Sequence, residues 1–159
     1  SYDKKIIVGP NKLTGEWGQN PIPGPMDEYE KSVKRHCGRV GAIEVFLSGP
    51  GLENYYEYKT KSKIPSREIV SLYQKKDSVA GEVMNVYFER IARSFSSFVN
   101  ILDPDIIVCG GGMSEIGGIY DEVPKRIIPY IASNFFLTPI VKAAHGSSSG
   151  VRGAAHLWN

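Results

Sequence analysis

The chain has 159 residues, of which 42% are apolar and 23% are charged, and its formal net charge is +2. These values are typical of one globular domain with a buried core, and the small net charge excludes the strongly basic surface of a nucleic-acid-binding protein. No apolar run approaches the ~20 residues that a membrane-spanning helix needs and no signal peptide is recognisable, so we expect a cytoplasmic protein that binds neither nucleic acid nor membrane.

The first element that the pattern predicts is a short strand at residues 5–8, preceded by the turn-like sequence Asp-Lys-Lys. A hairpin turn should follow a strand, and none precedes this one, so we expect the chain to be one half of a longer protein. The two cysteines, Cys37 and Cys109, lie far apart in the sequence. Reduced thiols in a cytoplasmic protein are the simplest interpretation.

Residues 15–21 read Gly-Glu-Trp-Gly-Gln-Asn-Pro and place two hydrogen-bonding side chains, Glu16 and Gln19, beside Trp17. A carboxylate accepts hydrogen bonds from sugar hydroxyls, an amide both donates and accepts, and an aromatic ring covers an apolar sugar face. The alternative is a solvated loop with a half-buried tryptophan, and the spacing alone favours that alternative.

Residues 27–34 are charged and predict an irregular segment, followed by a glycine-containing loop that delivers Glu44 to a strand at residues 45–47. His36 and Cys37 are possible zinc ligands by residue type. A closed zinc site needs about four ligands, and two adjacent residues do not provide them. Residues 48–51, Ser-Gly-Pro-Gly, predict a turn, and the tyrosines after it favour packing and surface roles.

Two helices are predicted next, at residues 66–74 with Ser66 as the cap and at residues 78–102 with Asp77 as the cap. The second is the longest element of the chain and ends before Asp103 and Pro104. Its apolar residues recur at helical spacing and predict one buried stripe. The stripe consists of Val79, Val83, Val86, Tyr87, Ile91, Phe95, Phe98 and Leu102.

A β-branched apolar run at residues 106–108 predicts a strand buried on both faces, as in the parallel sheet of an α/β protein. Gly110, Gly111 and Gly112 follow it at the carboxyl end, where ligands bind in open α/β sheets. Because the run has no side chains, a nucleotide could approach the backbone closely; the alternative is a tight turn that needs glycine only for its backbone angles. We favour nucleotide contact.

The remaining pattern predicts a helix at residues 119–130 with a central proline, a strand at residues 139–144, a polar turn at residues 145–150 and a closing helix at residues 151–158. His145 in the polar turn is typical of a surface residue. No Ser-His-Asp set follows from these spacings.

Taken together, Gly-Glu-Trp-Gly-x-Asn-Pro at residues 15–21, Cys-Gly-x-x-Gly-x-x-Glu at residues 37–44, the glycine run and residues 148–155 resemble the carboxy-terminal half of ROK-family sugar kinases, particularly the bacterial fructokinase/mannokinase-like branch. The resemblance implies an α/β fold of the actin/hexokinase-like (ribonuclease H-like) ATPase type, with a mixed sheet flanked by helices. It also implies that residues 1–159 form a single domain, the carboxy-terminal lobe of a two-lobe kinase.

The same resemblance implies roles for individual residues. Glu16, Gln19 and Glu44 would bind a hexose, and the glycines Gly110, Gly111 and Gly112 would lie against the adenosine of ATP. Magnesium would accompany the ATP, held through the other lobe, and a homodimer is one possible assembly.

The chain departs from the family at the zinc site, which uses a histidine and three cysteines. Here those positions hold Gln19, Arg35, Cys37 and Ala42, so one ligand of four remains. We therefore expect no bound zinc and expect packing to hold the loop instead.

A second departure is that the family's phosphate-binding segment and catalytic aspartate belong to the amino-terminal half, which this sequence lacks. No catalytic residue is assigned in this chain, and alone it should be inactive. Two alternatives stay open: the sugar-sensing half of a ROK transcriptional repressor and a degenerate pseudokinase lobe. The retained glycines favour the kinase.

Overall fold

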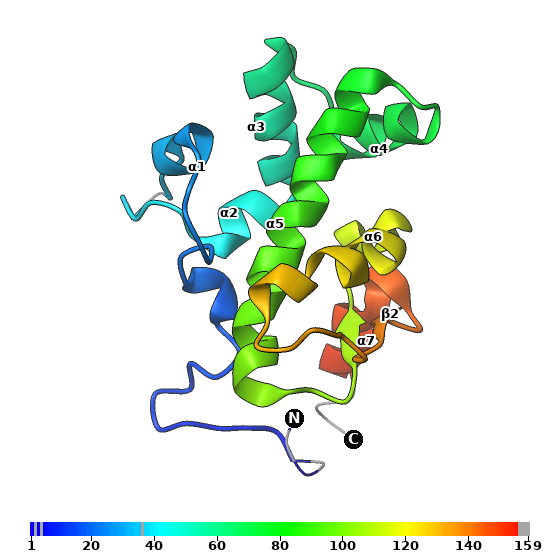
Figure 1. The fold of residues 1–159 in the computed structure, drawn as a ribbon. Coiled ribbons are helices and arrows are strands. Elements are labelled where there is room, and N and C mark those ends of the chain that lie inside the picture. Colours follow the sequence, from blue (N-terminus) through cyan, green and yellow to red (C-terminus); the bar gives the residue numbers. More distant parts are fainter. Residues whose placement is uncertain (2, 4, 36, 156–159) are drawn as a thin grey trace.

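Helix α5, Ser78–Leu102, runs through the centre of the molecule and the other elements are arranged around it (Figure 1). The structure is a computed structural model and describes residues 1, 3, 5–35 and 37–155. Helices α1 (Glu28–Ser32) and α2 (Ile43–Leu47) lie on one side of α5, while α6 (Gly118–Arg126) and the strands lie on the other.

Helix α5 confirms the length and the cap that the sequence predicts. The Asp77 carboxylate accepts from the N–H of Ala80 at 2.8 Å, and Asp103 ends the helix in the left-handed region with φ of 40°. The middle of the predicted stripe is buried, whereas Val79 and Leu102 at its ends are exposed. A second buried face was not predicted. It contains Met84, Phe88 and Ala92, and α5 as a whole packs against several neighbouring helices.

Helices α3 (Gly49–Thr60) and α4 (Ser66–Gln74) pack around the amino-terminal half of α5 (Figure 1). The prediction of a turn at residues 48–51 is wrong, because the Ser48 hydroxyl caps α3 by accepting from the N–H of Gly51 at 3.1 Å. Serine before a proline in the first turn is a helix-start signal. Helix α4 is confirmed but its predicted cap is not, since Pro65 occupies the cap position and the N–H of Ser66 donates to Glu53 at 2.8 Å.

The strand predicted at residues 45–47 is instead the end of helix α2, Ile43–Leu47. Its two fully buried residues, Ile43 and Phe46, are three positions apart, which is helical spacing. A five-residue apolar run does not distinguish a buried strand from a buried helix by periodicity, and in this fold the run is a helix.

The predicted irregular segment at residues 27–34 contains helix α1, which begins with a reciprocal capping box. The N–H of Glu30 donates to Asp27 at 2.7 Å, and the N–H of Asp27 donates to Glu30 at 3.3 Å. Glu30 is buried and also accepts from Arg90 of α5 at 2.9 Å. The Arg90 guanidinium lies 4.2 Å from the ring centre of Tyr55, so this ion pair fastens α1 to α5 inside an aromatic environment.

The sheet formed by the described residues has two parallel strands, β1 (Ile107–Cys109) and β2 (Ile140–Lys142). Burial of β1 on both faces was predicted and is wrong: Ile107 is buried, but Ile106 and Val108 are 51% and 58% exposed. Described elements cover only one face of the strand. Residues 6–9 have no strand assignment, so the strand predicted at residues 5–8 is not found either.

The carboxy-terminal part follows the predicted order with shorter elements. Helix α6 is followed by the 3-10 turn η3 (Ile128–Tyr130), and after β2 come η4 (Gly146–Ser148) and α7 (Ser149–Ala155). The end of the predicted closing helix, residues 156–158, lies outside the described residues. Within the described part of the chain, no helix is both long and apolar enough to cross a membrane.

Candidate functional site

Two short antiparallel pairings assemble the first part of the candidate site. Lys34 pairs with Val40 to close a hairpin, and Pro21 pairs with Ala42. The second pairing places the 3-10 turn η1 (Trp17–Gln19) beside the start of α2. Three segments that are distant in the sequence therefore meet at one place.

The side chains of Gln19, Arg35 and Glu44 form a closed hydrogen-bonded cluster where these segments meet. Gln19 Nε2 donates to Glu44 Oε2 at 2.8 Å, and Arg35 Nη2 lies 2.7 Å from Glu44 Oε1. Arg35 Nη1 donates to Gln19 Oε1. Each member of this polar cluster thus bonds to both of the others, and two predicted sugar-binding residues are in direct contact.

The polar cluster is buried on one side and open on the other. The Arg35 side chain is only 11% exposed, whereas that of Glu44 is 42% exposed. A carboxylate has about four acceptor positions, and two are used within the cluster, so two remain for incoming hydroxyls. A Cβ on Gly18 would lie in van der Waals contact with Cβ of Glu44, at 3.4 Å, so η1 packs directly against the start of α2.

Glu16 lies at the start of η1 and is exposed. It lines a hollow of about 680 Å³ together with Gln19 and Arg39. Glu44 does not line this hollow and reaches it only through Gln19. The structure therefore brings Gln19 and Glu44 together and places Glu16 on the same hollow as Gln19.

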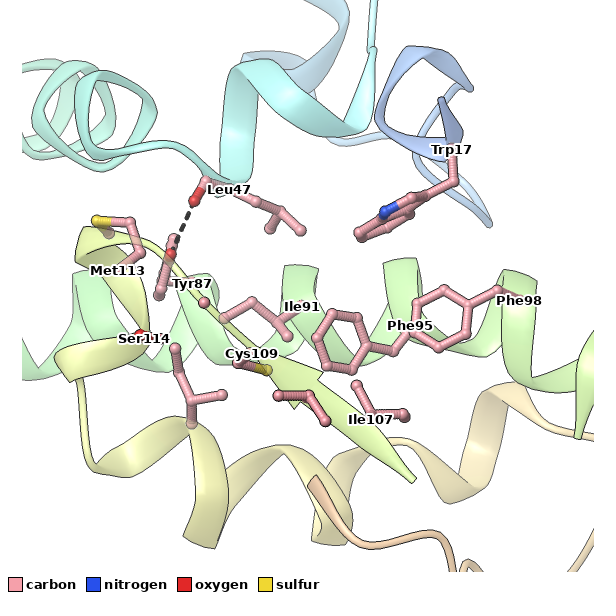
Figure 2. A pocket seen from close by; sticks show the side chains of 13 residues that line it. Trp17, Leu47, Tyr87, Ile91, Phe95, Phe98, Ile107, Cys109, Met113 and Ser114 are labelled. Atoms are coloured by element: carbon pink, nitrogen blue, oxygen red, sulfur yellow. Dashed lines mark hydrogen bonds between the residues drawn. The ribbon is translucent and has the colours of Figure 1, made fainter. Parts of the chain in front are cut away.

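Trp17 is partly buried and anchors η1 to α5 (Figure 2). Its ring centre lies 6.0 Å from that of Phe95 and 5.3 Å from that of Phe98, both in edge-to-face arrangement. Such pairs stabilise beyond simple area burial. The half-buried tryptophan that the sequence suggested is a packing anchor, and it fixes the position of the flanking Glu16 and Gln19.

The residues at the family's zinc positions do not fit a zinc ion. Gln19 and Arg35 bond to each other, Ala42 offers no ligand atom, and Cys37 is exposed. Across the described residues, no three His, Cys, Asp or Glu side chains cluster closely enough to hold a metal. A guanidinium does not replace a thiolate as a zinc ligand. The expected absence of zinc stays a prediction, and hydrogen bonds as well as packing hold the loop.

Both cysteines are free thiols but differ in environment. A hydrogen bond from the backbone of Arg39 lowers the pKa of the exposed Cys37 thiol, and the nearby positive charges of Arg35 and Arg39 act in the same direction. Burial raises the pKa of Cys109.

The glycine run forms the second part of the candidate site. Gly110 directly follows β1, Gly111 has φ of +82°, and Gly112 begins the 3-10 turn η2 (Gly112–Glu115). All three glycines are exposed, and a Cβ at Gly111 or Gly112 would meet nothing within 4 Å. The positive φ explains why Gly111 is glycine, but the open space beside Gly112 is not needed for the turn. That space leaves room for a ligand.

An apolar cavity of about 420 Å³ lies between η1, α5 and β1, and it separates the two parts of the candidate site (Figure 2). Trp17 lines one end and Gly110 lines another part of the same cavity. The hydroxyl of Tyr87 donates to the carbonyl of Leu47 at 2.9 Å and so ties α5 to α2 beside the cavity.

Sequence reasoning missed one member of the site. Arg35 was considered only as a lost zinc ligand, and its bonds to Gln19 and Glu44 were not foreseen. Its spacing to either partner carries no periodic signal, since both contacts depend on the hairpin and on the pairing of Pro21 with Ala42.

Comparison with known proteins shows the family of this chain. The sequence profile described as the ROK family matches residues 1–159. The chain belongs to the ROK family. A relative named N-acetyl-D-glucosamine kinase, from Vibrio atlanticus (strain LGP32), is 36% identical over 160 aligned positions, which cover 98% of this chain and 53% of the relative. This ROK chain therefore spans about half the length of the curated relatives it matches.

Solved structures show the fold of this ROK chain. A ROK family glucokinase from Streptomyces griseus, in complex with glucose and AMPPNP, aligns with a TM-score of 0.78 and 19% identity, covering 92% of this chain and 51% of the glucokinase. The chain accordingly has the actin/hexokinase-like α/β fold that the resemblance implied. A ROK family transcriptional regulator, described as a homolog of the Escherichia coli MLC protein, aligns with a TM-score of 0.58 over 74% of this chain and 32% of the regulator.

Proposed function

We propose that residues 1–159 form the carboxy-terminal lobe of a cytoplasmic, ATP-dependent hexose kinase. The observation that carries the proposal is the polar cluster, in which Glu44 is bonded to Gln19 at the edge of the hollow that Glu16 lines. The similarity over 98% of the chain to a relative named as a sugar kinase supports the same conclusion.

The sugar would bind through its hydroxyl groups. An ionised glutamate only accepts hydrogen bonds, so Glu16 and the free acceptor positions of Glu44 would each receive a hydroxyl proton. Gln19 would add little direct recognition, because its amide already bonds to both partners. N-acetyl-D-glucosamine is the first substrate to test because of the relative's name, and fructose, expected from the fructokinase-like resemblance, is the second.

The adenosine of ATP would lie against Gly110, Gly111 and Gly112, where the exposed backbone has no side chain to obstruct it. Magnesium would accompany the phosphates, and no residue of this chain is assigned to it. The base that activates the sugar hydroxyl would lie outside residues 1–159, because no residue of the candidate site is assigned that role. The isolated chain is therefore expected to be inactive.

The second candidate function is the sugar-sensing part of a transcriptional repressor, supported by the fold shared with the ROK regulator. A repressor half would still bind sugar at Glu16 and Glu44 but would not need ATP at the glycines. A degenerate pseudokinase would bind both ligands without transferring phosphate. Either form could assemble as a homodimer.

The test is calorimetric titration of the full-length protein with glucose, fructose, mannose and N-acetyl-D-glucosamine, and separately with ATP and magnesium. Hydrogen bonds to charged groups contribute roughly 1.5–3 kcal/mol, so Glu16→Gln should weaken binding of the preferred sugar by about tenfold to a hundredfold. Glu44→Gln should weaken it at least as much, because it also leaves Arg35 without its charge partner.

A matched control is Glu28→Gln, which makes the same change at an exposed position of α1. This variant should bind sugar and ATP like the unmodified protein. Unchanged sugar affinity in both Glu16→Gln and Glu44→Gln would refute the assigned site. Sugar binding without ATP binding would favour the repressor, and binding of both without phosphorylated product would favour the pseudokinase.

A further inference from the structure

Two backbone hydrogen bonds fix the position of Arg35 independently of its side chain. Its N–H donates to the carbonyl of Arg39 at 2.9 Å, and its own carbonyl accepts from Gly38 at 2.9 Å. Gly38 has φ of +82°, which closes the turn. The stem of Arg35 is thus fixed in a tight hairpin, and its guanidinium reaches from there to two other segments.

The polar cluster can be satisfied in only one arrangement. The Gln19 oxygen faces the guanidinium and its NH₂ group faces the carboxylate, so both ends of the amide are used. The two oxygens of Glu44 accept from different partners, which fixes the rotation of the carboxylate. Among the described residues, Gln19 and Arg35 are the only side chains that donate to Glu44. Removing the guanidinium would leave this partly exposed carboxylate held by Gln19 alone, with its other oxygen free to turn toward water.

We propose that Arg35 is a positioning residue of the sugar site: it holds Glu44, directly and through Gln19, in the orientation that receives the sugar hydroxyls. This proposal rests on the proposed function. The planar guanidinium presents two N–H groups in a fixed fork and can bond to both partners at once, whereas a lysine ammonium is a single point charge. Arg35 acts on the sugar through Glu44 and is not itself assigned a substrate contact.

Arg35 also explains how this chain manages without the family's zinc ligands. A metal would join the loop segments through several protein ligands, and here a guanidinium joins the η1 turn, the hairpin and α2 through hydrogen bonds and one ion pair. The joined segments carry Glu16 and Glu44, the two residues that the proposed function assigns to sugar hydroxyls. The substitution at position 35 therefore keeps the recognition loop organised by a different chemistry.

The first test compares Arg35→Met and Arg35→Lys with Lys34→Met in the full-length protein. Lys34→Met removes the same charge from the neighbouring exposed position of the hairpin. We expect Arg35→Met to raise the Kd and the KM for the preferred sugar by about tenfold, with the Kd for ATP and kcat changing less than about twofold, because charge-assisted bonds of this kind are strong. Arg35→Lys should recover only part of the affinity, and Lys34→Met should lose none.

The second test is a double-mutant cycle between Arg35→Met and Glu44→Gln, read by sugar titration. If Arg35 acts through Glu44, the double variant should bind sugar no more than about twofold more weakly than Glu44→Gln alone. The positioning role would be overturned if the loss of sugar affinity in the double variant equalled the product of the two single-variant losses. Unchanged sugar affinity in Arg35→Met would overturn it as well. Should Arg35→Met fail to fold, the same cycle with Arg35→Lys gives the answer by the same criterion.

The outcomes separate this proposal from the proposed function. If the unmodified protein binds none of the four sugars, the sugar-kinase proposal fails, and the positioning role fails with it. If the unmodified protein binds sugar and Arg35→Met binds it equally well, only the positioning role fails.

Discussion

Replacing Phe95 by alanine should lower the stability of the fold and disturb the proposed sugar site, because Phe95 supports Trp17. Phe95 is buried in α5, and its ring lies edge-to-face against Trp17 and beside Phe98. Phe88, two turns earlier in α5, is buried more completely, and a Cβ on Gly118 would lie only 2.5 Å from its ring. Phe88→Ala is therefore the matched control, with a large loss of packing far from Trp17.

The size of the effect follows from how each ring is enclosed. Truncating a buried phenylalanine to alanine costs about 3–5 kcal/mol. Phe95 already borders the 420 Å³ cavity, so part of its ring has no partner atoms, and we expect a cost near 3 kcal/mol. Of this, about 0.5–1.5 kcal/mol is the ring pair with Trp17. Phe88 is almost completely enclosed, with 1% of its surface exposed, and we expect about 4–5 kcal/mol for Phe88→Ala.

Urea denaturation followed by circular dichroism measures both free energies of unfolding in the full-length protein. The fluorescence of Trp17, obtained as the difference between each variant and the same variant carrying Trp17→Phe, should shift to longer wavelength in Phe95→Ala and not in Phe88→Ala. Sugar affinity should fall several-fold only in Phe95→Ala. A destabilisation below about 1 kcal/mol for Phe95→Ala, or equal sugar losses in the two variants, would refute the view that Trp17 anchors the sugar loop to α5.

Three further outcomes are expected. Gly51→Ala should cost about 3 kcal/mol in urea denaturation, since its Cβ would lie 2.2 Å from the carbonyl oxygen of Val45; a loss near zero would mean that α2 and α3 separate freely. Gly112→Val should raise the KM for ATP much more than that for sugar, and equal increases would indicate general disruption. Because the pKa of Cys37 is lowered while that of Cys109 is raised, iodoacetamide should alkylate Cys37 about tenfold faster than Cys109 near pH 7.5. Mass spectrometry of the peptides measures both rates, and faster alkylation of Cys109 would contradict the prediction.

Local signals in the sequence were sufficient for some elements of the fold. Helix α5 was predicted because Asp77 caps it and its apolar residues keep one period over many turns. Helix α1 was missed although Asp27 and Glu30 carry the spacing of a capping box. Helix α2 was missed for a different reason, since five apolar residues fit a buried strand or a buried helix equally well.

The candidate site was predicted in its parts and not in its assembly. The types of Glu16 and Gln19 allowed sugar recognition, and the family resemblance added Glu44. Contact between Gln19 and Glu44, however, depends on pairings that bring together residues 25 positions apart. The role of Arg35 depends on the same pairings. No periodicity encodes such contacts, because they are set by the tertiary path of the chain rather than by neighbours in the sequence.

One structural feature sets a limit on how the ligands can move relative to each other. The η1 turn, which carries residues of the proposed sugar site, is attached to α5 through Trp17. Strand β1, which leads into the glycine run, follows α5 after the connection formed by residues 103–106. Trp17 contacts α5 at Phe95 and Phe98, about two turns before the helix ends at Leu102, so both recognition elements are attached to the same short, rigid part of α5. Spin labels at Lys12 and Glu115 should consequently report the same separation with and without sugar or nucleotide, and any domain closure in the full-length protein would have to move both elements together with the end of α5.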